Sequence, residues 1–120
     1  MKSIYFSFSI FAFLFGCSAT ANKVRESPPR IFENSKQSES VVNCVIEKYD
    51  GIGLHSVLKI VPKGDGGKTI KVGVSRDSDV IKLLIDISPI RNGSSIKSYE
   101  NFAVLPADRK IVEECGSGNF

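Results

Sequence analysis

Hydrophobic residues first recur at a regular spacing in the segment before residue 50. The spacing i, i+1, i+4, i+5, i+8 places them on one face of an amphipathic helix, with Cys44 at the flank of that face. Asn34 or Ser35 is the candidate N-cap and Gly51 the candidate stop. The apolar positions are Val41, Val42, Val45, Ile46 and Tyr49.

The middle of the chain changes to the two-residue period of β-strands. One run, 54–61, ends at Pro62, and a glycine-rich turn at 63–67 leads into a second run, 69–74. A third run, 81–87, places four aliphatic residues on one face, with Lys82 and Asp86 on the other. The first two runs therefore predict a hairpin that continues into a third strand.

The last third of the chain predicts a turn, a weak strand and a helix. Asn92-Gly93 suits the positive φ angles of a type I′ hairpin turn, and residues 94–99 would return as an edge strand. Pro89 fits a strand only at an edge or a bulge, because it cannot donate a backbone hydrogen bond. Pro106 begins a segment with helical spacing that includes Cys115.

These elements predict an α+β domain over residues 34–120. It comprises an N-terminal helix, about four antiparallel strands in a meander, and a C-terminal helix. An amphipathic helix and a half-buried sheet each need a partner for their apolar side, so we expect both helices to pack on one sheet face.

The N-terminus has a different pattern. Lys2 precedes an apolar run, Ile4 to Phe15, interrupted only by two serines. A dozen residues form a helix of about 18 Å, which is shorter than the roughly 30 Å hydrocarbon core of a bilayer. The pattern therefore predicts a signal peptide over residues 1–16.

Leu14-Phe15-Gly16-Cys17 follows the apolar run and resembles the lipobox of bacterial lipoproteins. The resemblance implies cleavage before Cys17, a diacylglycerol on its sulfur and acylation of the new N-terminus. Residues 17–33 would then be the lipidated cysteine and a flexible tether. Ser18, rather than Asp, after the cysteine implies an outer-membrane position facing the periplasm. The Cys44-Val45-x-x-Lys48-Tyr49 sequence and the late Cys115 resemble small uncharacterised lipoproteins of Gram-negative bacteria and prophages.

A second cleavage site stays open, because Ala19-Thr20-Ala21 fits the small-x-small pattern of an ordinary signal peptidase site. Cleavage after Ala21 would give a soluble periplasmic or secreted protein, and an uncleaved anchor is a third alternative. All three place the domain outside the cytoplasm, in the cell envelope or beyond it.

Composition and cysteine content agree with one small exported domain. The 120 residues carry 16 basic and 13 acidic side chains, a balance that argues against nucleic-acid binding. Apart from Cys17, the cysteines are Cys44 and Cys115. In an oxidising compartment we expect a disulfide, worth roughly 4 kcal/mol for a loop of about seventy residues, with two separate buried thiols as the alternative.

Candidate chemistry is sparse, and the sequence predicts no metal, no cofactor and no catalytic residue. His55 and Ser56 are adjacent, so on a strand they would face opposite sides. The carboxylate pairs Glu47/Asp50 and Glu113/Glu114 are typical of solvated helix surfaces. The loop 64–68 lacks the glycine spacing and following helix of a phosphate loop, and the Asp77-x-Asp79 pair lacks the rest of a calcium loop.

We therefore expect a non-catalytic protein, held on a membrane by its lipid, that binds an envelope protein or peptidoglycan. A small wall-active hydrolase is the alternative. The candidate binding element is the predicted edge strand, with Ile96, Lys97 and Tyr99, because an edge strand can accept a partner strand.

Overall fold

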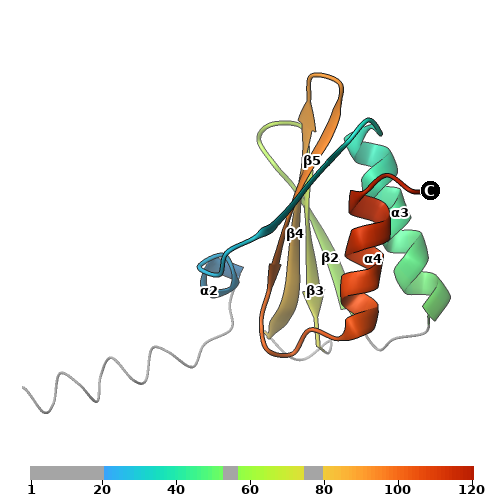
Figure 1. Ribbon diagram of the computed structural model, residues 1–120. Coiled ribbons are helices and arrows are strands. Elements are labelled where there is room, and N and C mark those ends of the chain that lie inside the picture. Colours follow the sequence, from blue (N-terminus) through green and yellow to red (C-terminus); the bar gives the residue numbers. More distant parts are fainter. Residues whose placement is uncertain (1–20, 53–56, 75–79) are drawn as a thin grey trace, which may run out of the picture.

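One antiparallel sheet of five strands forms the centre of the protein (Figure 1). The computed structural model describes residues 21–52, 57–74 and 80–120. In chain order the elements are α2 (Ala21–Val24), β1 (Arg30–Asn34), α3 (Ser38–Ile52), β2 (Val57–Pro62), β3 (Lys68–Gly73), β4 (Ile81–Ile90), β5 (Gly93–Glu100) and α4 (Pro106–Gly116). The strand order across the sheet is β1-β5-β4-β3-β2.

The four strands β2 to β5 form the predicted meander, because each pairs antiparallel with the next along the chain. Strand β1 comes before α3 in the sequence, yet it pairs with β5. The predicted α+β class is thus confirmed, and the sheet has one strand more than the alternating pattern predicts.

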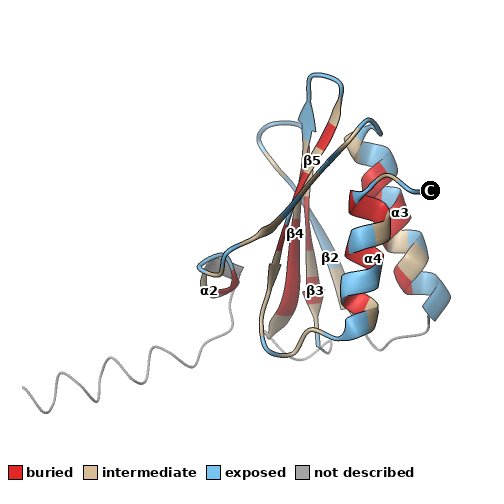
Figure 2. Ribbon diagram, in the orientation of Figure 1, coloured by how far each residue is buried: buried red, intermediate tan, exposed pale blue. Residues whose placement is uncertain are grey.

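Helices α3 and α4 lie together on one face of the sheet, as predicted (Figure 1). Helix α3 contacts β3, β4 and β5, and α4 contacts β1. Figure 2 shows buried residues on the helix sides that face the sheet and along the central strands. The core between these layers contains Val41, Val42, Cys44, Val45, Tyr49, Ile70, Val72, Leu83, Ile85, Ile87, Ile96, Ile111, Val112 and Cys115.

Helix α3 buries the predicted face but begins later than expected, at Ser38. Asn34, expected as a helix cap, instead ends β1. Its Oδ1 accepts the backbone N–H of Lys36 at 2.8 Å, and its Nδ2 donates to the carbonyl oxygen of Gly116 at 2.8 Å. Asn34 therefore joins β1 to the end of α4, and the cap prediction is wrong.

The β4–β5 hairpin is present, but its turn is displaced by one residue from the prediction. Ile90 pairs with Gly93, so the two-residue loop is Arg91-Asn92. Among the described residues only glycines have positive φ, which rules out the type I′ turn expected at Asn92-Gly93. Gly93 is needed for another reason: a Cβ there would lie 1.8 Å from the carbonyl oxygen of Asn34.

Pro89 lies within β4 where the prediction allows it. The last β3–β4 pair is Lys68 with Ile87, so β4 continues past the end of β3. Pro89 pairs there with Ser94 of β5 alone. Its missing N–H therefore costs no hydrogen bond to a second strand.

Strand β1 overturns two expectations. Residues 30–33 belong to a strand instead of a flexible tether. Because β1 pairs with β5, β5 lies between β1 and β4 and is not an edge. Its central residue Ile96 is 1% exposed. The predicted edge strand at 94–99 is therefore wrong, and the edges of the sheet are β1 and β2.

On the opposite sheet face, which we call the open face, α2 is the one described helix that packs against the strands. This short helix contacts β4, where Leu84 is fully buried and Val24 is 3% exposed. Figure 1 shows α2 on the side of the sheet away from α3 and α4. The chain before β1 is thus held against the domain at Val24 and Arg25.

Candidate functional site

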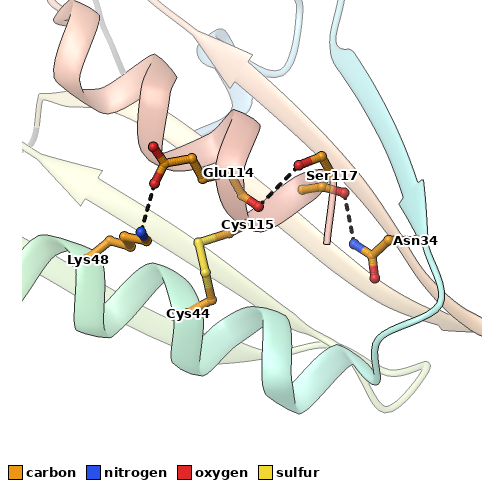
Figure 3. Close-up of a disulfide and its surroundings, with 7 residues drawn as sticks. Asn34, Cys44, Lys48, Glu114, Cys115 and Ser117 are labelled. Atoms are coloured by element: carbon orange, nitrogen blue, oxygen red, sulfur yellow. Dashed lines mark hydrogen bonds and ion pairs between the residues drawn. A yellow bond between two sulfur atoms is a disulfide. The ribbon is translucent and has the colours of Figure 1, made fainter. Parts of the chain in front are cut away.

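The predicted disulfide joins the two long helices. Cys44 of α3 and Cys115 of α4 form a bond whose Cα atoms lie 5.7 Å apart (Figure 3). Both cysteines are buried, at 6% and 0% exposure, so the sulfur atoms are shielded from solvent thiols. The bond closes a separation of 71 residues. It therefore confirms the predicted pairing and acts as a structural clasp.

Polar contacts continue the clasp on both sides of the disulfide. One helix turn from Cys44, Lys48 Nζ lies 2.7 Å from Glu114 Oε2, as Figure 3 shows. This contact holds the pKa of Glu114 below its usual value. On the other side of the disulfide, the Asn34 side-chain amide donates to the carbonyl oxygen of Gly116, the last residue of α4. Strand β1, α3 and α4 are thus fixed to one another around one covalent bond.

A buried ion pair that sequence reasoning missed lies between the helices and the sheet. Lys82 Nζ lies 3.1 Å from Asp108 Oδ2, and the two side chains are 6% and 0% exposed. Tyr49 donates its hydroxyl hydrogen to Asp108 Oδ1 at 2.7 Å, and the Leu105 N–H donates to Oδ2 at 2.8 Å. Burial, followed by the hydrogen bond to Asp108, raises the pKa of Tyr49 above its usual range.

A β-bulge explains why Lys82 lies on the helix side. Val72 pairs with Leu83 and Gly73 pairs with Ile81, so Lys82 is the extra residue without a partner on β3. A bulge rotates the side chains around it away from simple alternation. Lys82 therefore reaches Asp108 on α4 instead of solvent. In the sequence, the position of Asp108 in the first turn of a predicted helix is the one signal that could have marked it.

On the open face, a second charged cluster fastens the N-terminal segment. Arg25 Nη2 and Nε donate to the two carboxylate oxygens of Asp86 at 3.0 and 3.3 Å, and Thr69 Oγ1 donates at 2.6 Å. Burial tends to raise the pKa of Asp86, but the hydrogen bonds from Arg25 and Thr69 outweigh it and hold the pKa below its usual value. This contact positions α2 on β4.

Strand β2 is the more accessible of the two sheet edges. The last four residues of β2 are all exposed, with Ile60 and Val61 at 41% and 40%. The other edge, β1, is held by Arg30, whose Nη2 lies 2.6 Å from Glu113 Oε1 of α4. An open edge with apolar side chains is a common place for strand addition.

The hydrogen-bond register shows which β2 groups face outward. Lys63 N–H donates to the Gly67 carbonyl at the end of the hairpin. In an antiparallel pair, bonded and non-bonded residues alternate. The backbone N–H and C=O groups of Leu58 and Ile60 therefore point away from β3, and Pro62 falls at the next outward position. The outward N–H and C=O groups of Leu58 and Ile60 are therefore the ones that a further strand would bond.

The remaining predicted site residues are dispersed. Lys97 and Tyr99 lie on the open face of the inner strand β5, while Ile96 is in the core. Glu113 and Glu114 are in ion pairs with Arg30 and Lys48, and Asp65 accepts the N–H of Gly67 at 2.9 Å, as in an ordinary turn. Five of the residues considered in the sequence lie outside the described part of the chain: Cys17, His55, Ser56, Asp77 and Asp79.

A polar groove of about 560 Å³ opens between the start of α3 and the β4–β5 turn. Its lining carries both Glu39 and Arg91, so it favours neither sign of charge. Within residues 21–52, 57–74 and 80–120, no group of three or more His, Cys, Asp or Glu side chains is arranged to hold a metal ion. None of the helices in those ranges is long and apolar enough to cross a membrane.

Comparison with models of protein families, with curated proteins and with solved structures finds no match to this chain.

Proposed function

We propose that the protein is a lipid-anchored component of the bacterial cell envelope that acts by binding a partner protein rather than by catalysis. The observation that carries the proposal is the Cys44–Cys115 disulfide. Such a bond is typical of an oxidising compartment, and it uses the two cysteines other than the lipobox Cys17. Export and acylation at Cys17 explain all three cysteines of the chain.

The binding mode that the described residues support best is strand addition at β2. Its outward N–H and C=O groups at Leu58 and Ile60 offer the hydrogen bonds of a further strand. The exposed Ile60 and Val61 side chains offer apolar contacts on the two faces of that strand. This surface replaces β5, which is enclosed by its two neighbours.

The mass of the intact protein, purified from host membranes with and without reduction, tests the anchor. We expect a chain that begins at Cys17 and carries acyl groups, with a gain of about two daltons on reduction of one disulfide. A C17S variant should lose the acyl mass and leave the membrane fraction. A wild-type chain that begins at Asn22 without added mass would contradict the proposal and indicate soluble export.

Site-specific photocrosslinking in intact cells tests the binding mode, with the crosslinker at position 58 of β2, on the helix side of the sheet. We expect a discrete adduct that disappears in I60P, because proline removes an outward N–H without breaking the β2–β3 ladder. The matched control is F102S, which removes a 92% exposed apolar side chain from the β5–α4 loop and should leave the adduct unchanged. An adduct of equal yield in I60P would refute strand addition at β2.

A further inference from the structure

The position of α2 fixes the side of the domain from which a lipid anchor would emerge. Cys17 precedes Ala21, the first residue of α2, by four residues. Four residues span at most roughly 14 Å when fully extended. Because Val24 and Arg25 hold this segment against β4, the lipid attachment point lies within that distance of the start of α2 on the open face.

The open face carries an excess of positive charge: among the described residues, three lysines without ion pairs share it with one such carboxylate, Glu33 of β1. Lys59 and Lys71 are directly opposite each other on β2 and β3, an arrangement that costs stability. Lys97 is opposite Asp86, whose carboxylate is already occupied by Arg25 and Thr69. Within the described parts of the chain, none of these three lysines has an ion pair.

The helix side differs, because its charges balance. Lys68, which lies on that side opposite Ile87, has no ion pair among the described residues, but neither do Glu47 and Asp50 of α3. Lys48 and Lys110 both pair with Glu114, and Arg109 pairs with Glu100. In the described part of the chain, the excess of basic over acidic side chains without ion pairs therefore lies on the face from which the anchor would emerge. Ile31 and Val61, which are 61% and 40% exposed, flank the same face at its two edges.

We propose that the open face rests on the anionic lipid headgroups of the membrane that holds the anchor. The proposal rests on the lipid anchor proposed above. A lysine near an anionic membrane surface contributes a factor of roughly five in binding, so three lysines contribute roughly a hundredfold. The anchor keeps the domain at a high effective concentration near the lipid headgroups, and the charge of the open face then determines which side of the domain contacts them. Helices α3 and α4 consequently point away from the bilayer.

Lysine footprinting of the acylated protein in vesicles tests this orientation. The vesicles contain phosphatidylcholine, with or without phosphatidylglycerol. A membrane-impermeant amine reagent labels the protein molecules on the outer surface of the vesicles, and the labelled lysines are identified by peptide mass analysis. We expect labelling of Lys59, Lys71 and Lys97 to fall several-fold with the anionic lipid. Labelling of Lys110, which is 77% exposed on α4, should not change. At about 1 M salt, where the screening length is about 3 Å, the protection should disappear.

Two double variants distinguish the effect of the open-face lysines from the effect of net charge. In K59Q/K71Q we expect Lys97 to lose its protection, whereas in K36Q/K110Q, which removes the same charge elsewhere, Lys97 should stay protected. Equal protection of Lys97 in the two variants would overturn the role of these lysines. Thermal unfolding of both variants verifies that each is folded.

The outcomes also distinguish other occupants of the face. If protection of the three lysines depends on the number of protein molecules per vesicle but not on the charge of the lipid, a second copy of the chain covers the face and the proposal is overturned. Protection in cells but not in anionic vesicles would indicate a protein partner and overturn it as well. An acylated protein without protection refutes only the orientation, whereas a mature chain without acyl mass refutes the anchor itself.

Discussion

Replacing Asp108 by alanine tests the most interconnected polar contact of the fold. Asp108 is fully buried and accepts hydrogen bonds from Tyr49 of α3 and from the backbone before α4, besides its ion pair with Lys82 of β4. Loss of the contact at the helix start costs about 1 kcal/mol. Leaving the ammonium group of Lys82 buried without a partner costs about 3–5 kcal/mol. We therefore expect D108A to lower the free energy of unfolding by about 4 kcal/mol or more.

Urea unfolding of the disulfide-bonded protein measures this loss. With a slope of about 2 kcal/mol per M, the midpoint should fall by about 2 M. The control is D50A, an exposed carboxylate of α3, which should change the free energy by less than about 0.5 kcal/mol. In K82M/D108A no charge remains buried, so part of the loss should be recovered. A D108A loss near 1 kcal/mol, or a double variant as unstable as the sum of the single changes, would refute the reasoning.

Three further predictions concern the clasp, the buried tyrosine and the β4–β5 turn. C44A/C115A should lose roughly 4 kcal/mol in urea unfolding, because the unfolded chain regains the freedom of a loop of about seventy residues; a loss below about 1 kcal/mol would contradict this. The raised pKa of Tyr49 means that its contribution is complete below the unfolded pKa of about 10 and is lost as pH rises toward the higher folded pKa. Thermal unfolding should therefore show an alkaline decline above about pH 10 that is weaker in Y49F, and identical profiles would refute the assignment. G93A should lower the melting temperature by several degrees, since its methyl group would lie 1.8 Å from the carbonyl oxygen of Asn34, whereas G64A, with no atom near its added methyl, should not.

Patterning alone predicts the elements whose burial follows a regular period. The apolar stripe of α3, the alternating residues of β4 and the helical spacing in α4 each place their side chains in the core. The disulfide is expected from the cysteine count and the predicted oxidising compartment, and the structure pairs the same two residues. Sequence reasoning succeeds here because each element is stabilised by its own apolar face.

Strand β1 could not be found in this way, because its core side is mostly polar. Arg30 and Asn34 of that side bond to Glu113 and to the carbonyl of Gly116, and only Phe32 packs against the core. Lys82 was missed because a bulge is invisible to a strict two-residue period. Both errors concern polar side chains satisfied by distant residues, and no local pattern records such partners.

Strand β1 and the Arg25–Asp86 contact change the relation between the proposed anchor and the domain. A tether that ended at residue 33 would let the domain turn freely above a membrane, with every face equally near the lipids. With β1 in the sheet and Arg25 bonded to Asp86, only residues 17–20 separate the lipobox cysteine from the folded part. If Cys17 is lipidated as proposed, four residues place the lipid within roughly 14 Å of the start of α2 and so keep the open face near the membrane. Strand β2 is an edge of the sheet, so the proposed partner strand would extend the sheet sideways and leave the proposed membrane contact in place.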